Sequence, residues 1–76
     1  MPHVIVKLHS GRSEQQKAAL AEAVTRAVVD ILGSSEESVS VGIEDVQPRH
    51  WTEQVYKPDI LAKPDTIYKK PGYDQR

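Results

Sequence analysis

Two short segments of the chain alternate apolar and polar side chains, which is the period of a β-strand with one buried face. They cover residues 3–9 and residues 38–44. The apolar positions fall at every second residue: Val4, Val6 and Leu8 in the first segment, and Val39, Val41 and Ile43 in the second. Because successive side chains of a strand point to opposite faces, each set of three shares one face. The pattern predicts two half-buried strands.

A long amphipathic helix is predicted between the two strands. Ser13 and Gln16 have the spacing of a capping box, in which each side chain satisfies a backbone donor of the first helical turn. Gly33 stands where a helix C-cap is expected. The apolar residues between them recur at helical spacing: Leu20, Val24, Ala27, Val28 and Ile31.

The order strand, helix, strand predicts an α/β fold, a small βαβ protomer. A long helical crossover connects parallel strands, because a tight hairpin can connect only antiparallel ones. Two strands under one helix leave two open sheet edges and bury too little apolar surface to stand alone. We therefore expect the sheet to be extended by dimerisation.

The whole chain, residues 1–76, is expected to form one domain, with a βαβ core at about 2–46 and short helices and a tail at about 47–76. Residues 47–51 are predicted to form a loop, and residues 52–56 a short helical turn. Pro58 and Pro64 should divide the remainder into short pieces. Pro64 is a candidate first helical residue of a piece running to Lys70.

Charge and composition exclude several classes of function. The chain has 76 residues, a net charge of −1 and no basic cluster, which argues against nucleic acid as a partner. It has no cysteine, so thiolate catalysis and disulfides are excluded. The longest apolar runs are too short for a membrane span, and the first residues do not resemble a signal peptide. We expect a cytoplasmic protein without membrane contact. His3 and His9 lack metal-ligand spacing and are expected to be solvated, so no metal site is predicted.

The residue with the most distinctive chemistry is Pro2, directly after Met1. A small second residue normally allows removal of the initiator methionine, which would leave the proline nitrogen as a free secondary amine. An ordinary α-amino group titrates near ~7.7–8.0. An apolar pocket beside a cation lowers that value, because both effects disfavour the charged form. Such an amine suits proton abstraction next to a carbonyl. Many chains begin Met-Pro without any catalytic role, so the dipeptide alone does not establish this function.

Taken together, these features resemble the 4-oxalocrotonate tautomerase family. The resemblance rests on Met-Pro, a strand of about seven residues, the run from Gly11 to Lys17, the long helix and the Val-x-Val-x-Ile strand, and it covers the core up to about Trp51. The ending from Ile67 to Tyr73 is similar to the longer-tailed PptA-type tautomerases. The resemblance implies a βαβ protomer that dimerises into a four-stranded sheet, and a cofactor-independent isomerase that interconverts the enol and keto forms of a 2-oxo acid.

Three site residues follow from the resemblance. Pro2 matches the family's catalytic base, Arg12 matches an arginine that binds a substrate carboxylate, and Trp51 matches an aromatic residue that lines the pocket. Arg12 also precedes a helix start, which itself favours an anion. An ordinary solvated role for Arg12, and simple core or interface packing for Trp51, remain open.

One position departs from the family pattern. The dicarboxylate tautomerases carry a second arginine near the position of Ser40, and serine cannot make a bidentate charge-assisted contact with a carboxylate. Arg49, in the following loop, is a possible substitute. A monocarboxylate enol such as an aryl-enolpyruvate, with its ring against Trp51, fits the remaining groups better than a dicarboxylate.

Two other functions and two assemblies remain open. Pro2 could serve as a cationic acid in dehalogenation by hydration or in decarboxylation, with Glu44 as the nearest strand carboxylate to position water. Alternatively, the chain is a non-catalytic assembly module in which Pro2 merely begins a strand. Short-tailed members of the family form trimers of dimers. Because this tail must pack on the outer face of the dimer, we expect a homodimer rather than a hexamer.

Overall fold

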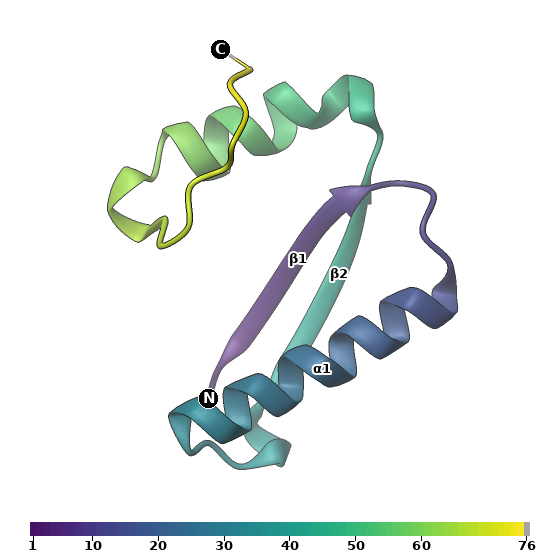
Figure 1. Ribbon diagram of the computed structural model, residues 1–76, viewed down its shortest axis with the longest axis vertical. Helices are drawn as coiled ribbons and strands as arrows, with labels where there is room; N and C mark the ends of the chain where they lie inside the picture. The colour runs from purple at the N-terminus through teal and green to yellow at the C-terminus, as the bar shows by residue number, and fades with distance from the viewer. Residues whose placement is uncertain (76) are drawn as a thin grey trace. The chain divides into compact units, whose positions relative to one another are not determined.

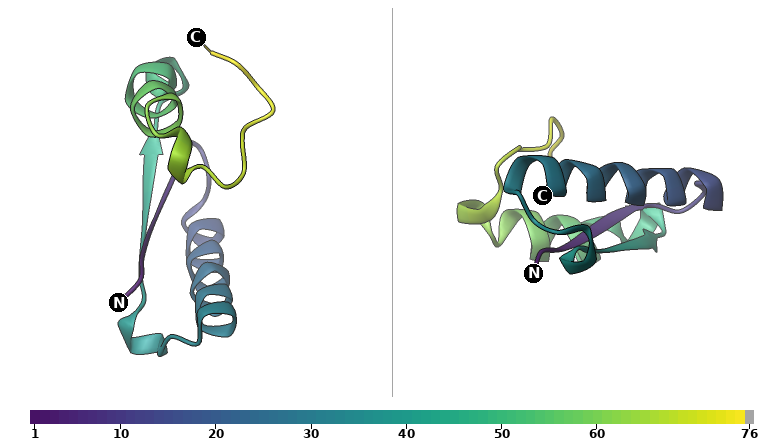
Figure 2. Two further views of the ribbon diagram at one scale, coloured as in Figure 1. Left: turned by 90° about the vertical axis from the view of Figure 1, so that its left-hand side faces the viewer. Right: turned by 90° about the horizontal axis from the view of Figure 1, so that it is seen from below.

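β1 (His3–His9) and β2 (Ser40–Val46) are neighbours in a two-stranded sheet, and α1 (Glu14–Leu32) connects them. The two strands run in the same direction, and α1 lies along one face of the pair (Figures 1 and 2). This computed structural model describes residues 1–75 in two compact units, Met1–Asp45 and the chain from Val46 onward, each of which is considered by itself. The predicted βαβ fold with parallel strands is confirmed.

The register of the two strands is set at the amino terminus. The backbone N–H of Ser40 donates a hydrogen bond to the carbonyl oxygen of Pro2, at 3.2 Å. The second strand therefore begins at Ser40, two residues later than predicted. The reason is η1 (Glu36–Ser38), a single 3₁₀ turn closed by the bond from the N–H of Ser38 to the carbonyl of Ser35. This turn takes up the first residue of the predicted strand.

Both ends of α1 have the predicted caps. The Ser13 hydroxyl accepts from the Gln16 N–H, and the Gln16 side chain accepts from the Ser13 N–H, both at 3.1 Å. At the other end Gly33 has φ 71°, a left-handed conformation that glycine adopts without steric cost, and its N–H donates to the carbonyl of Val29. The capping residues therefore determine where α1 begins and ends.

Lys17 ties the first turn of α1 to the end of β2. Its ammonium lies 2.5 Å from a carboxylate oxygen of Asp45 and 3.2 Å from one of Glu14. The hydrogen bond to Asp45, and after it the one to Glu14, raises the pKa of Lys17 above its ordinary value of 10.5. A raised lysine pKa stabilises the folded state at every pH below about 10.5, and that contribution is lost as the pH rises through the folded-state pKa.

The βαβ unit buries little of its own apolar surface. No residue of α1 is buried, and Ile31, Leu32 and Ile5 are exposed. The buried hydrophobic residues of the described chain are Val46, Val55 and Tyr56. The first unit thus leaves several large apolar side chains exposed.

The second unit differs from the sequence prediction in three places. The predicted loop contains a one-turn 3₁₀ helix, η2 (Pro48–His50). The predicted short turn at residues 52–56 is longer and forms a π-helix, η3 (Thr52–Leu61), that continues through Pro58. The predicted helix from Pro64 to Lys70 is a single 3₁₀ turn, η4 (Pro64–Thr66).

η3 continues through Pro58 as a π-helix and not as an α-helix. In an α-helix a proline lacks one N–H donor and its ring clashes with the carbonyl four residues earlier. A π-helix pairs residues five apart, as in the bond of 3.0 Å from the Ala62 N–H to the Lys57 carbonyl. η4 does begin at Pro64 as expected, but it ends early because Ile67 has extended backbone angles, φ −89° and ψ 105°.

We predict that Ser13→Ala lowers the free energy of unfolding by about 1 kcal/mol, the usual cost of losing an N-cap side chain. Urea denaturation at fixed protein concentration measures the change. Ser35→Ala is the matched control, because Ser35 stands at the N-cap of η1 but its side chain makes no capping hydrogen bond. Equal destabilisation by the two substitutions would show that the capping box contributes nothing.

Candidate active site

Pro2 lies directly before β1, and its backbone is bound to β2. It is half-buried, and its carbonyl oxygen accepts the N–H of Ser40. Met1 is fully exposed, so its removal would break no buried contact. The position of residue 2 is therefore set by the sheet and not by Met1. A proline amine created by the removal of Met1 would be held at the start of the sheet.

A side-chain pair beside Pro2 was not predicted from the sequence. Nδ1 of His3 lies 2.6 Å from the hydroxyl oxygen of Ser40, although both residues are exposed. The expectation of a merely solvated His3 was therefore incomplete. The pair forms because the strand register places residues 3 and 40 next to each other, and no local sequence pattern reports that register.

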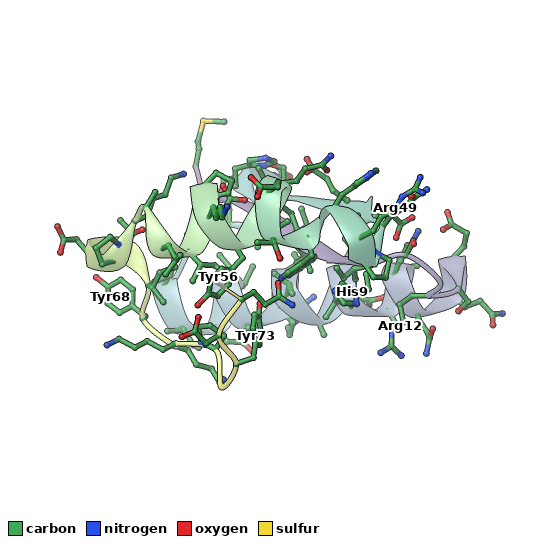
Figure 3. All side chains as sticks on the ribbon, turned by 90° about the horizontal axis from the view of Figure 1, so that it is seen from above. His9, Arg12, Arg49, Tyr56, Tyr68 and Tyr73 are labelled. Carbon is green, nitrogen blue, oxygen red and sulfur yellow. The ribbon has the colours of Figure 1, made fainter. Side chains whose placement is uncertain are left out.

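Arg12 lies on the turn between β1 and α1, and its exposed side chain projects outward (Figure 3). It lines a shallow hollow of about 180 Å³ together with Leu8, Gln16, Lys17 and Leu20. The ammonium of Lys17 in the same hollow is already bound to Asp45 and Glu14. The guanidinium of Arg12 is therefore the better placed of the two cations to bind an incoming carboxylate.

One protomer does not bring Pro2 and Arg12 together. The seven residues of β1 separate them. A strand rises about 3.3 Å per residue, so the two ends of β1 are roughly 20 Å apart. That length exceeds the reach of an arginine side chain across a small 2-oxo acid. A site containing both groups would need an arginine from another copy of the chain.

Trp51 belongs to the second unit and stands at the N-cap of η3. It is half-buried, and its indole N–H donates a hydrogen bond of 2.9 Å to the hydroxyl of Tyr73. The Tyr73 ring in turn contacts the buried ring of Tyr56, with centroids 5.5 Å apart and planes tilted by 38°. Figure 3 shows Tyr56 and Tyr73 close together and Tyr68 apart from them. The link from Trp51 to the tail was not predicted, since 22 residues separate the partners.

Residues 1–75, the part of the chain that the structure describes, contain neither a candidate metal cluster nor a candidate membrane-spanning helix. No group of three or more histidine, cysteine, aspartate or glutamate side chains could hold a metal ion. Within the same residues, no helix is both long enough and apolar enough to cross a membrane.

Comparison with known proteins identifies similar sequences and folds. A family model described as "Tautomerase enzyme" matches residues 2–55. A "Probable tautomerase" of Xylella fastidiosa is 44% identical over 75 residues, which cover 99% of this chain and 92% of the relative. "Tautomerase PptA" of Cronobacter sakazakii is 41% identical over 75 residues, covering 97% of this chain and 99% of the relative. The crystal structure of TomN, "a 4-Oxalocrotonate Tautomerase homologue in Tomaymycin biosynthetic pathway", superposes with a TM-score of 0.65 at 44% identity, covering 66% of this chain and 77% of that one.

Proposed function

The chain belongs to the tautomerase family, and from that premise we propose that it is a cofactor-independent isomerase interconverting the enol and keto forms of a 2-oxo acid. One observation carries the proposal. The family match begins at residue 2, a proline whose backbone is bound to the sheet and whose nitrogen would be a free amine if Met1 is removed.

In the proposed reaction Pro2 is the general base. The free secondary amine takes the enol hydroxyl proton, and electron density moves to the neighbouring carbon. The same nitrogen returns a proton to that carbon, which leaves the ketone and the neutral amine. Partial burial of Pro2 supports this role, because an amine partly removed from water is less readily protonated and so remains a base near neutral pH.

Arg12 and Trp51 are proposed to bind the substrate. The Arg12 guanidinium would hold the carboxylate next to the 2-oxo group, and the Trp51 ring would lie against an apolar or aryl substituent. Ser40 replaces a second arginine, and its hydroxyl already pairs with His3. This arrangement favours a substrate with one carboxylate, such as an aryl-enolpyruvate.

We further propose that the active unit is a homodimer. Two copies related by a two-fold axis place opposite ends of their strands side by side, which would bring the partner's Arg12 to Pro2. Dimerisation would also cover the exposed apolar residues Ile5, Ile31 and Leu32. The separation along β1 and the thin core both support a second copy.

The dehalogenase and decarboxylase alternatives lack support from Glu44. Glu44 is four residues further along β2 than Ser40, the residue that pairs with Pro2. At about 3.3 Å per residue, that distance is roughly 13 Å. Glu44 of the same chain is therefore too far from Pro2 to position a water molecule for it.

We predict that Pro2→Ala lowers kcat/KM for phenylenolpyruvate by roughly 10²–10⁴, the usual contribution of a positioned base. The alanine variant would carry a primary amine of different shape in place of the ring nitrogen. Mass spectrometry must first show that Met1 is absent from both proteins. Unchanged turnover in the processed, folded variant would exclude Pro2 as the base. Retention of Met1 on the cellular protein would leave an amide there and favour the assembly module.

Arg12→Ala should lower kcat/KM for the acid. The corresponding loss of transition-state stabilisation should be about 1.5–3 kcal/mol, the range for hydrogen bonds to charged groups. A neutral ester of the same substrate should respond little. Arg26→Ala, which removes an exposed arginine from α1, is the control for a general loss of positive charge. Equal losses for acid and ester would assign Arg12 a structural role.

Mixing the two impaired variants tests the shared site. After unfolding and refolding an equal mixture of Pro2→Ala and Arg12→Ala chains, half of the dimers are mixed and each has one intact site. About a quarter of the wild-type activity should therefore return. No recovery would show that each chain supplies both groups to its own site.

Sedimentation equilibrium of the same samples is the control on assembly. A mass of two protomers agrees with the proposal, and a mass of six would reject the dimer in favour of the hexamer. A mass of one protomer would reject the argument from open sheet edges.

A further inference from the structure

The last residues of the tail bind the beginning of η3 through three side-chain hydrogen bonds. The Tyr73 hydroxyl accepts the Trp51 indole N–H at 2.9 Å, Asp74 accepts the Tyr56 hydroxyl at 3.3 Å, and Gln75 accepts the Thr52 hydroxyl at 2.9 Å. We call residues 73–75 the tail strap. In Figure 1 the yellow tail turns back after η4 and crosses η3 in the view.

The tail strap and η3 enclose part of an open hollow. A hollow of about 340 Å³ lies between the tail and η3, lined by Tyr56, Ile60 and Leu61 of η3 and by Pro71, Tyr73 and Asp74 of the tail, among others. Atoms facing such a space lose the dispersion contacts of a filled core. The three hydrogen bonds and the contact between the Tyr73 and Tyr56 rings hold the strap to η3.

The bond to Tyr73 restricts the orientation of the Trp51 ring. The terminal torsion of a tryptophan side chain is broad, so packing on a half-buried ring leaves a range of orientations. The indole N–H is a donor only, and an acceptor at a fixed position selects the orientations that point the N–H toward it. The Tyr73 hydroxyl is such an acceptor, because the ring that carries it is held against the buried Tyr56.

We propose that Tyr73 is a positioning residue that sets the orientation of Trp51 and thereby the preference of the site for aryl over alkyl 2-oxo acids. This inference rests on the proposed function, in which Trp51 lies against the substrate's substituent. An oriented ring presents a flat face for an aryl group, whereas an alkyl chain adapts to a ring in several orientations. Tyr73 acts only through Trp51 and leaves the groups that carry the proton and the carboxylate unchanged.

The test compares Tyr73→Phe with Tyr68→Phe. Tyr73→Phe keeps the ring against Tyr56 and removes only the hydroxyl that accepts the indole N–H. Tyr68→Phe removes the same atom from a side chain that is 99% exposed, and so serves as the matched control. Both substitutions are small enough to preserve folding, which far-ultraviolet circular dichroism verifies.

Trp51 is the only tryptophan of the chain, so its fluorescence reports on this ring alone. Tyr73→Phe should lower the steady-state anisotropy of Trp51 and raise its quenching by acrylamide, and Tyr68→Phe should change neither. Equal anisotropy and equal quenching in the two variants would overturn the proposal, because the Trp51 ring would then be held without the Tyr73 hydroxyl. This measurement needs no substrate, so its result is independent of whether the proposed keto–enol reaction is correct.

Kinetics test the preference for aryl substrates. Tyr73→Phe should raise KM for phenylenolpyruvate by roughly 2–10-fold, as expected for the loss of one neutral hydrogen bond. It should leave kcat, and the KM for the enol of an alkyl 2-oxo acid, nearly unchanged. Equal changes of KM for the two substrates would overturn the role in selectivity, even with altered fluorescence.

A double substitution separates positioning from a general structural effect. If Tyr73 acts through Trp51, then Tyr73→Phe should have no further effect on the KM ratio once Trp51→Phe has removed the indole. Additive effects of the two substitutions would overturn the proposal, because Tyr73 would then act by another route.

Discussion

The hydrogen bond from the Ser40 N–H to the Pro2 carbonyl connects the amino terminus to the sheet. It sets the register of β1 and β2, and through that register it brings His3 to within hydrogen-bond distance of the Ser40 hydroxyl. A terminal proline without this bond would belong to a frayed end, where an amine has no defined position. The proposed chemistry needs a base at a defined position, so it depends on the first residue of β2 as much as on Pro2 itself.

The small size of the protomer limits what one chain can do. One helix against two strands leaves Ile5, Ile31 and Leu32 exposed, and the length of β1 separates the proposed base from the proposed carboxylate-binding arginine. A second copy addresses both limits, since it can cover the apolar surface and supply the missing cation. In the proposed dimer, function therefore depends on assembly, because β1 is too long for one chain to bring its own Pro2 and Arg12 together.

In the second unit, side-chain hydrogen bonds contribute to the tertiary structure alongside a few buried residues. Its buried residues are few, and side-chain hydrogen bonds hold its tail to η3. The family match ends at residue 55, whereas the relative from Cronobacter sakazakii is similar over 97% of the chain. The tail is therefore a feature shared with particular relatives and lies beyond the family's common core. Its hydrogen bond to Trp51 connects a segment outside that core to a residue of the proposed site.

Local features of the sequence determined much of the first unit. The alternation of Val4, Val6 and Leu8 predicted β1 with its observed bounds, and the Ser13–Gln16 capping box and Gly33 predicted the limits of α1. These features succeed because strand period, capping and left-handed glycine depend on residues only a few positions apart. Pro2 was indicated by the chemistry of a free proline amine as well as by the resemblance, whereas Arg12 and Trp51 rest mainly on the resemblance, and the three roles stay predictions.

Only the tertiary structure decided the remaining features. The His3–Ser40 pair spans 37 positions and the Trp51–Tyr73 bond spans 22, and neither exists until the strand register and the path of the tail are set. The course of η3 through Pro58 was mispredicted for a related reason. A proline in a local pattern signals a helix end, whereas the π-helical turn that accommodates it pairs residues five apart and leaves no periodic signature in the sequence. Contacts between distant residues depend on how the chain packs, and a pattern of neighbouring residues does not contain that information.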